Sequence, residues 1–233
     1  MKNMLMFSLF TAAMLAAGTA AAGGGNLLGG AGGGIEEGTM YGGGSVGQST
    51  TNCMIQDAFA GDPVLGGEKD CSTNGWKVYG GYQVTDMFAI EGGYYSLGTS
   101  EESAVGTTTK SLDGTSYTFQ DPKTEGNASG VGISGVATIP VMDNLNVFGK
   151  VGAMKWQSEG TMSSTVSNGA TTLPLKVQAD VDGTSLLLGA GASYSINENW
   201  GIRGEYEHFK RQDVLGEDRD VGIMSAGVTF STL

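Results

Sequence analysis

The stretch Gly75–Leu97, GWKVYGGYQVTDMFAIEGGYYSL, decides the fold of this chain. Its first half alternates strictly. One face carries Trp76, Val78, Gly80, Tyr82 and Val84, and the other carries Lys77, Tyr79, Gly81 and Gln83. After a polar turn at Thr85-Asp86, an apolar row resumes at Phe88, Ile90, Gly92 and Tyr94, with Glu91 on the opposite face. This pattern predicts a β-hairpin with about ten residues in each arm. Such a hairpin suits either a soluble sandwich or a membrane barrel, in which the apolar face meets lipid.

The N-terminus predicts export from the cytoplasm. Residues 1–22 combine Lys2, an apolar core at Met4–Ala17 and a small-residue cleavage site at Ala20-Ala21-Ala22, which is the pattern of a signal peptide. Beyond it no apolar run approaches the roughly twenty residues of a spanning helix. We therefore expect a signal peptide at residues 1–22, a glycine-rich arm at 23–38 and a β-barrel domain at 39–233.

Composition excludes several functions. The formal net charge of −12 opposes nucleic-acid binding, which needs basic surface to replace counterions. Cys53 and Cys71 predict one disulfide within the first external loop, with a pair of free thiols as the alternative. The single histidine, His208, lies far from both cysteines in sequence, so no metal site and no cofactor are expected.

The spacing of strands and loops selects the fold class. Short polar turns alternate with long polar stretches such as Gly98–Ala128 and Gln157 to about Asp182. Outer-membrane barrels show this asymmetry, with short periplasmic turns and long extracellular loops. We predict an all-β protein, an eight-stranded antiparallel transmembrane β-barrel. Besides the two arms of the opening hairpin, its strands are expected at Thr39–Gln48, Gly130–Ile139, Leu145–Trp156, Ser185–Ile196, Trp200–Phe209 and Val221–Phe230.

Three segments carry a resemblance to a known family: Phe88–Tyr94, Gly149–Trp156 and Ile202–Tyr206. With them, residues from Thr39 to Phe230 resemble the OmpA-like outer-membrane β-barrels, in a small form without the peptidoglycan-binding domain. The resemblance implies a monomer in the outer membrane of a Gram-negative cell, surrounded by lipids and lipopolysaccharide. The alternating run that ends at Phe230 resembles the signal read by the barrel-assembly machinery, although three residues follow it here.

Charged residues are expected inside the barrel. Alternation directs Glu91, Lys150, Arg203 and Glu205 to the lumen, which side chains fill in a barrel of this size. Buried charges must pair, so Arg203 is predicted to bridge to Glu91 and Lys150 to one of the acids. The cluster is either a structural plug or, as the resemblance suggests, a switchable gate in a narrow pore. The family often has Lys and Glu at two positions that are Val136 and Ser193 here, which weakens the gate hypothesis.

Aromatic residues are expected where the barrel meets the lipid headgroups. Trp76, Tyr82, Tyr94, Trp200 and Phe230 lie near strand ends or on outward faces and fit such girdles. An outer-membrane lipid-modifying enzyme is a third hypothesis, but the neighbours of His208 do not provide the serine and orienting group of a nucleophilic site. The sequence therefore favours a structural or surface-interaction protein with acidic extracellular loops, an unknown extracellular ligand and no enzymatic activity. A narrow small-solute pore is the alternative.

Overall fold

The computed structural model describes residues 38–52, 70–103, 106–212 and 218–232. The predicted signal peptide, Cys53 and the predicted arm, apart from Gly38, lie outside these ranges. No helix in the described ranges is long and apolar enough to cross a membrane. The regular elements are all strands: β1 (Met40–Asn52), β2 (Asp70–Thr85), β3 (Phe88–Ser103), β4 (Thr107–Leu112), β5 (Thr115–Met142), β6 (Leu145–Ser167), β7 (Thr172–Ser195), β8 (Trp200–Gln212) and β9 (Asp218–Ser231).

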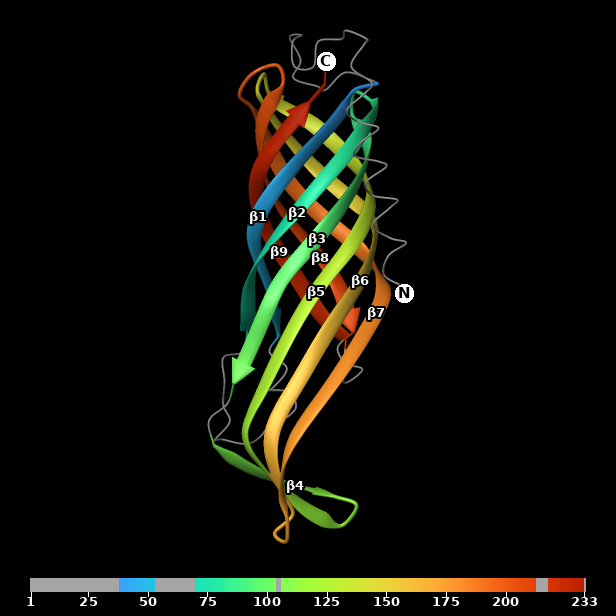
Figure 1. Ribbon diagram of the computed structural model, residues 1–233. Coiled ribbons are helices and arrows are strands. Elements are labelled where there is room, and N and C mark those ends of the chain that lie inside the picture. The colour runs from blue at the N-terminus through green and yellow to red at the C-terminus, as the bar shows by residue number, and fades with distance from the viewer. Residues whose placement is uncertain (1–37, 53–69, 104–105, 213–217, 233) are drawn as a thin grey trace.

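Eight of these strands close into an antiparallel ring (Figure 1). The sheet runs in sequence order except that β4 pairs only with β5, so β3 and β5 are neighbours in the ring. Pairing of β1 with β9 brings together the first and last strands, from Tyr41↔Ser231 to Thr51↔Val221. The structure confirms the predicted eight-stranded barrel.

Short connections join strands at one end of the ring. Asp86-Met87 links β2 to β3, Asp143-Asn144 links β5 to β6, and residues 196–199 link β7 to β8. Polar side chains stabilise two of these turns. Thr85 Oγ1 accepts a hydrogen bond from the Phe88 amide at 3.1 Å, and Asn197 Oδ1 accepts one from the Trp200 amide at 2.9 Å. In outer-membrane barrels the end with short turns faces the periplasm.

At the other end, strands replace two of the predicted loops. The stretches Gly98–Ala128 and 157–182 were expected to be irregular, but the ladder between β6 and β7 continues without a break to Ser167↔Thr172. β5 likewise extends back to Thr115, where a two-residue turn leads to β4. Asp113 and Gly114 both have positive φ, 50° and 77°, as a tight hairpin turn requires. These strands form a projection beyond the ring, defined here as β4 with residues 115–126, 159–167 and 172–180, and visible at the bottom of Figure 1.

The loop expectation was wrong because neither of the two apolar layers of the lumen extends into the projection. Its sequence is rich in Thr, a β-branched residue that favours extended backbone. Its buried positions hold residues such as Thr108, Thr124 and Ser164 rather than apolar side chains, so apolar and polar residues do not alternate along β4, β5 and β6 and their sequence shows no period of two. The extended parts of β5, β6 and β7 nevertheless persist, because each continues a strand already paired in the ring.

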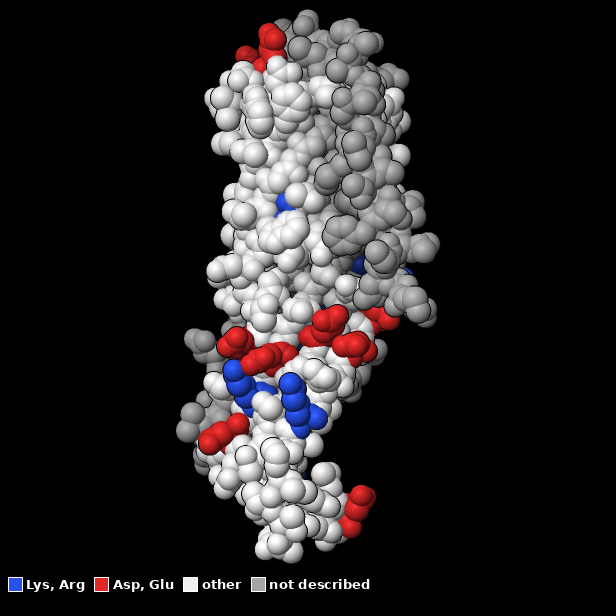
Figure 2. Space-filling model, viewed as in Figure 1, with Lys and Arg blue, Asp and Glu red and all other residues white. Residues whose placement is uncertain are grey.

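The outer surface of the ring carries an apolar band. Ile90, Ile133, Val151 and Leu186 all point outward and are more than half exposed, as a lipid-facing surface requires. The band ends at the first outward charges, such as Lys155 on β6 and Asp182 on β7. Figure 2 shows the same division, since Asp, Glu, Lys and Arg gather where the projection leaves the ring, and little charge lies above them.

The lipid face can be tested at Val151. Replacing it by Arg is expected to weaken insertion by about 2–4 kcal/mol if the site lies near the membrane midplane. Gln157→Arg is the matched control, because Gln157 is an exposed residue of the same strand beyond the apolar band. Folding into lipid vesicles, followed by urea titration, measures both variants. Equal losses at the two positions would contradict the lipid-facing assignment.

Candidate functional site: a charged layer inside the barrel

A layer of six charged side chains crosses the lumen. It contains the four predicted residues, Glu91, Lys150, Arg203 and Glu205, together with Lys77 and Glu207. All six are buried, with at most 6% of each residue exposed. The layer has three positive and three negative groups and is therefore balanced, which buried charges require.

Arg203 and Glu91 form the centre of the layer. Arg203 Nη1 lies 2.6 Å from Glu91 Oε2, and Nη2 lies 3.3 Å from Oε1, so both carboxylate oxygens accept from the guanidinium. Arg203 Nη2 also lies 3.1 Å from Glu205 Oε2. Lys150 Nζ lies 3.2 Å from Glu91 Oε1 and 2.9 Å from Glu205 Oε2. The two parallel N–H donors of a guanidinium hold a carboxylate in a fixed orientation. The ammonium group of a lysine acts as a point charge and does not fix the orientation in this way.

Lys77 and Glu207 extend the network across the barrel. Lys77 Nζ on β2 lies 2.7 Å from Glu207 Oε2 on β8 and also pairs with Glu205, while Lys150 pairs with Glu207. Sequence reasoning did not include these two residues in the cluster. The signal was present: Lys77 shares the parity of the inward row in the opening hairpin, and Glu207 shares that of Arg203 and Glu205.

Two tyrosines add hydrogen bonds to carboxylates of the layer. Tyr41 Oη donates to Glu91 Oε2 at 3.1 Å, and Tyr95 Oη donates to Glu207 Oε1 at 2.8 Å. The Arg203 guanidinium carbon lies 4.1 Å from the ring centroid of Phe148 and 4.8 Å from that of Tyr79. These contacts add cation–π attraction to the ion pairs.

A glycine leaves room for one of the long side chains. Lys150, Gly189 and Glu207 occupy one row on three adjacent strands, so the lysine must cross β7 to reach the glutamate. A Cβ at position 189 would lie 2.9 Å from Lys150 Cγ and Cε and 3.2 Å from Glu207 Cγ. Glycine is therefore the residue that permits this contact across β7.

Apolar layers cover the charges on both sides. The inner layer, toward the short turns, consists of Tyr41, Tyr79, Ala89, Val136 and Phe148. The outer layer consists of Tyr95, Leu97, Ala128, Met154, Trp156, Leu187, Phe209, Val221 and Ile223. Val136 thus belongs to the inner layer. The family often has Lys at this position, so the charge that would serve as an alternative partner in a gate is missing here. The described side chains fill this part of the lumen at three successive heights.

The predicted girdle residues lie on the outward face. Trp76, Tyr82, Trp200 and Phe230 are each between 42% and 48% exposed, and Tyr94 is partly exposed. Four of them contact each other in two pairs, with ring centroids 5.5 Å apart for the tilted rings of Trp76 and Tyr94 and 5.0 Å apart for the edge-on rings of Trp200 and Phe230. In a soluble sandwich such aromatic groups would be buried in the core.

The other predicted chemical groups lie apart from this layer. Cys71 belongs to β2 and its backbone pairs with Thr51, but Cys53 lies outside the described residues, so the disulfide stays a prediction. His208 lies on the outward side of β8, where its Nε2 is 3.2 Å from Asp220 Oδ1. Within the described ranges, no group of three or more His, Cys, Asp or Glu is placed to hold a metal ion.

Comparison with known proteins gives a family and several relatives. A model of the OmpA-like transmembrane domain matches residues 35–232. Outer membrane protein A of Salmonella typhi is 27% identical over 157 residues, which cover 66% of this chain and 38% of that protein. Outer membrane protein A of Klebsiella pneumoniae is 23% identical over 200 residues, which cover 84% of this chain and 51% of that protein. The chain thus spans about half or less of the length of these relatives.

Two solved structures are similar to this chain at low sequence identity. The attachment invasion locus protein Ail of Yersinia pestis has a TM-score of 0.43 and 14% identity, covering 84% of this chain and 99% of that one. Neisserial surface protein A has a TM-score of 0.46 and 13% identity, and the match covers 82% of this chain and 96% of that one.

Proposed function

Because this chain belongs to the OmpA-like transmembrane domain family, we propose that it is a closed outer-membrane anchor that presents an extracellular β-sheet to molecules outside the cell. The family places the protein in the bacterial outer membrane. Lipids and lipopolysaccharide are the surroundings proposed for its apolar band, and the protein is proposed to act without catalysis.

The observation that carries the proposal is the filled lumen. Six paired charges lie between two apolar layers, and each carboxylate of the charged layer contacts at least two cationic groups. A solute would have to break several buried ion pairs at once in order to pass. This cost favours an anchor over a narrow small-solute pore.

The projection supplies the surface proposed for contact. Outward carboxylates face each other where the projection joins the ring: Glu101 on β3 lies directly opposite Glu125 on β5, and Glu159 on β6 lies directly opposite Asp180 on β7. Like charges placed opposite each other repel and destabilise a sheet. Lys123 offsets part of this repulsion through its pair with Glu125, and the other facing acids are consistent with a surface selected for contact rather than for stability. The proposed ligands therefore carry positive charge or are bridged by cations.

Tags inserted at two turns test the presentation. A peptide tag between Asp113 and Gly114, at the tip of β4 and β5, is expected to bind antibody on intact cells. The same tag in the turn at residues 197–199 is expected to bind antibody only after the outer membrane is opened. The opposite pattern would reverse the orientation and overturn the proposal.

Conductance separates the anchor from the pore. The purified wild-type protein in planar bilayers is expected to show no discrete openings at neutral pH, because the charged layer stays paired. Regular single-channel steps that increase with protein concentration would favour the pore.

A further inference from the structure

One edge of the projection is open. β7 pairs with β6 from Thr172 to Tyr194, but its ladder with β8 covers only Leu188 to Ser195. Along residues 172–187 the other edge of β7 therefore has no strand beside it among the described residues, and Figure 1 shows β7 as the outermost strand there. Such an edge presents unpaired N–H and C=O groups to any strand that approaches it.

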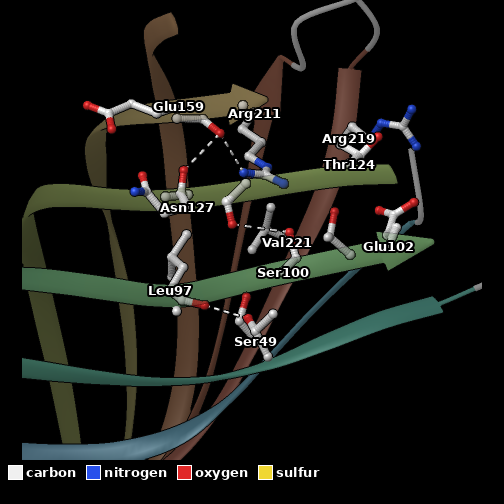
Figure 3. A pocket seen from close by; sticks show the side chains of 17 residues that line it. Ser49, Leu97, Ser100, Glu102, Thr124, Asn127, Glu159, Arg211, Arg219 and Val221 are labelled. Atoms are coloured by element: carbon white, nitrogen blue, oxygen red, sulfur yellow. Dashed lines mark hydrogen bonds between the residues drawn. The ribbon is translucent and has the colours of Figure 1, made fainter. Parts of the chain in front are cut away.

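β8 parts from β7 and stays with the ring. Beyond its pairing with β7 it continues in the ladder with β9 alone. Arg211 on β8 lines the lumen cavity drawn in Figure 3, where it donates to Ser158 Oγ on β6 at 3.1 Å. Ser185 Oγ on β7 donates to the carbonyl of Lys210, which joins β7 to β8 at the point where they separate. The open edge thus lies beyond this point, along residues 172–184.

The direction of the free backbone groups follows from the ladder with β6. The Ser195 amide donates to the Asn144 carbonyl, on the β6 side, at 2.8 Å. The register between β6 and β7 contains no bulge, so odd-numbered residues of β7 point their N–H and C=O groups at β6. Even-numbered residues point theirs at the open edge. Pro174 is the one of them that offers a carbonyl and no N–H.

The side chains of β7 alternate along this edge. The inner set, on the same face as the buried Leu187, consists of Leu173, Leu175, Val177, Ala179 and Val181, and the outer set consists of Lys176, Gln178, Asp180 and Asp182. Such alternation is typical of a strand with one covered face. Yet Leu173 is 62% exposed and Val177 is 47% exposed. An added strand would extend the inner apolar row and cover part of these side chains.

The outer row is complementary to itself. Gln178 lies midway between Lys176 and Asp180. If two β7 strands pair in antiparallel fashion about Gln178, Lys176 of each copy lies directly opposite Asp180 of the other, and such opposite charges stabilise a sheet. Thr172 then lies opposite Thr184, so the paired segment ends before Ser185, which is already joined to β8.

Pro174 and Lys176 make the edge selective. Proline and lysine on an edge strand oppose indiscriminate pairing. Pro174 removes one hydrogen bond near each end of the paired segment, whereas Lys176 favours a strand that has an acid opposite it. Asp180 of a second copy supplies that acid. Neither Lys176 nor Asp180 has an ion-pair partner among the described residues.

We infer that the open edge of β7 binds β7 of a second copy of this chain, held in a facing membrane. The strands of the projection run away from the ring (Figure 1). An antiparallel partner runs the opposite way, so its ring lies at the far end of the paired sheet and in a different membrane. The inference rests on the outward presentation proposed above and names its partner, the same protein on another cell.

Sedimentation velocity of the full mature chain in lipid nanodiscs, with one barrel in each disc, measures this pairing. We expect a species of two discs whose share rises with concentration. Discs that stay single at every concentration would overturn the inference. Because both ends of the barrel meet water in a disc, this result does not depend on which end faces outward in the cell. Single discs together with the expected tag pattern would overturn the pairing and leave the anchor standing.

Charge reversal tests the register. Lys176→Asp and Asp180→Lys are each expected to weaken the pairing roughly tenfold, because each replaces two ion pairs by two repelling pairs. An equimolar mixture of the two variants is expected to regain pairing, since each strand then meets the opposite charge at both positions. A mixture that pairs no better than its components would overturn the register.

Glu101→Lys is the matched control for net charge. Glu101 is an exposed residue of β3, which β5 and β6 separate from β7 in the sheet. It makes the same charge change as Asp180→Lys and is expected to leave pairing unchanged. Equal weakening in both variants would show a nonspecific effect of charge and overturn the contact.

Milder variants protect the test against misfolding. Heat-dependent migration on gels shows whether each variant folds. If a charge-reversed chain does not fold, Lys176→Gln and Asp180→Asn each remove both ion pairs without adding repulsion. Each is expected to weaken pairing several-fold, and unchanged pairing in both would overturn the assignment.

Discussion

Arg203→Ala is expected to destabilise the barrel by about 3–5 kcal/mol, since it leaves a buried charge without its partner. Glu91 would lose both donors of the guanidinium fork, at 2.6 and 3.3 Å, and Glu205 would lose its contact at 3.1 Å. Three buried acids would then face two buried bases. The packing of the guanidinium on Phe148 would disappear as well.

The double variant Arg203→Ala with Glu91→Gln separates charge balance from packing. It restores equal numbers of buried acids and bases, so it is expected to be more stable than Arg203→Ala alone. Urea unfolding in lipid vesicles, followed by tryptophan fluorescence, compares the wild type, Arg203→Ala, Glu91→Gln and the double variant. If the double variant instead loses the full sum of both single changes, Arg203 and Glu91 are not energetically coupled.

An exposed ion pair supplies the control. Lys123 Nζ lies 2.7 Å from Glu125 Oε1, nearly the same distance as in the central buried pair, but both side chains are almost half exposed. The hydrogen bond to Glu125, with its charge, raises the pKa of Lys123. Lys123→Ala is nevertheless expected to change stability little, because water and salt screen exposed pairs. Distance alone therefore does not set the expected loss.

Alternation in the sequence correctly predicted that four charged residues point into the lumen, but it did not predict that the charged layer contains six. Arg203 and Glu205 share a face because they are two residues apart, and the same rule applies to Glu207. The rule states which way a side chain points but gives no height along the barrel. Lys77 joins the layer through the register of β2 with β3, and Glu207 through the register of β7 with β8. Register is a property of paired strands that the sequence of one strand does not contain.

The apolar face was predictable wherever one side of a strand meets lipid. Tyr94 and Tyr95 are identical neighbours, yet Tyr94 lies outward beside Trp76 and Tyr95 lies inward beside Glu207. Parity in the opening hairpin predicted that division. It failed in the projection, where Thr161 and Met162 on β6 are exposed to similar degrees. Without a membrane or a core on one side, the sequence has no reason to alternate.

The outer apolar layer predicts a second large effect, at Phe209. Its ring is 1% exposed and belongs to the same layer as Met154 and Leu187, which are fully buried. Phe209→Ala is expected to cost about 3–5 kcal/mol, because the surrounding ladder is closed and cannot collapse into the cavity left behind. Urea unfolding in vesicles measures the loss.

Phe88→Ala is the matched control on the lipid face. Phe88 begins β3 and is 55% exposed, so lipid chains fill the space that its ring leaves. Only the transfer of the ring into lipid is lost, which is about 0.5 kcal/mol. Equal losses at positions 88 and 209 would contradict a packed layer inside the lumen.

Combining Phe209→Ala with Arg203→Ala tests whether the outer apolar layer keeps the charges dry. Phe209 lies two residues from Glu207 on the same inward face, and Tyr95 joins the outer layer to Glu207 through its hydrogen bond. Water that enters through the space left by Phe209 would solvate the acids that Arg203→Ala leaves in excess. A stranded charge costs much less in contact with water than in a dry interior. The double variant is therefore expected to lose less stability than the sum of the two single variants, and a fully additive loss would show that water does not reach the charged layer by this route.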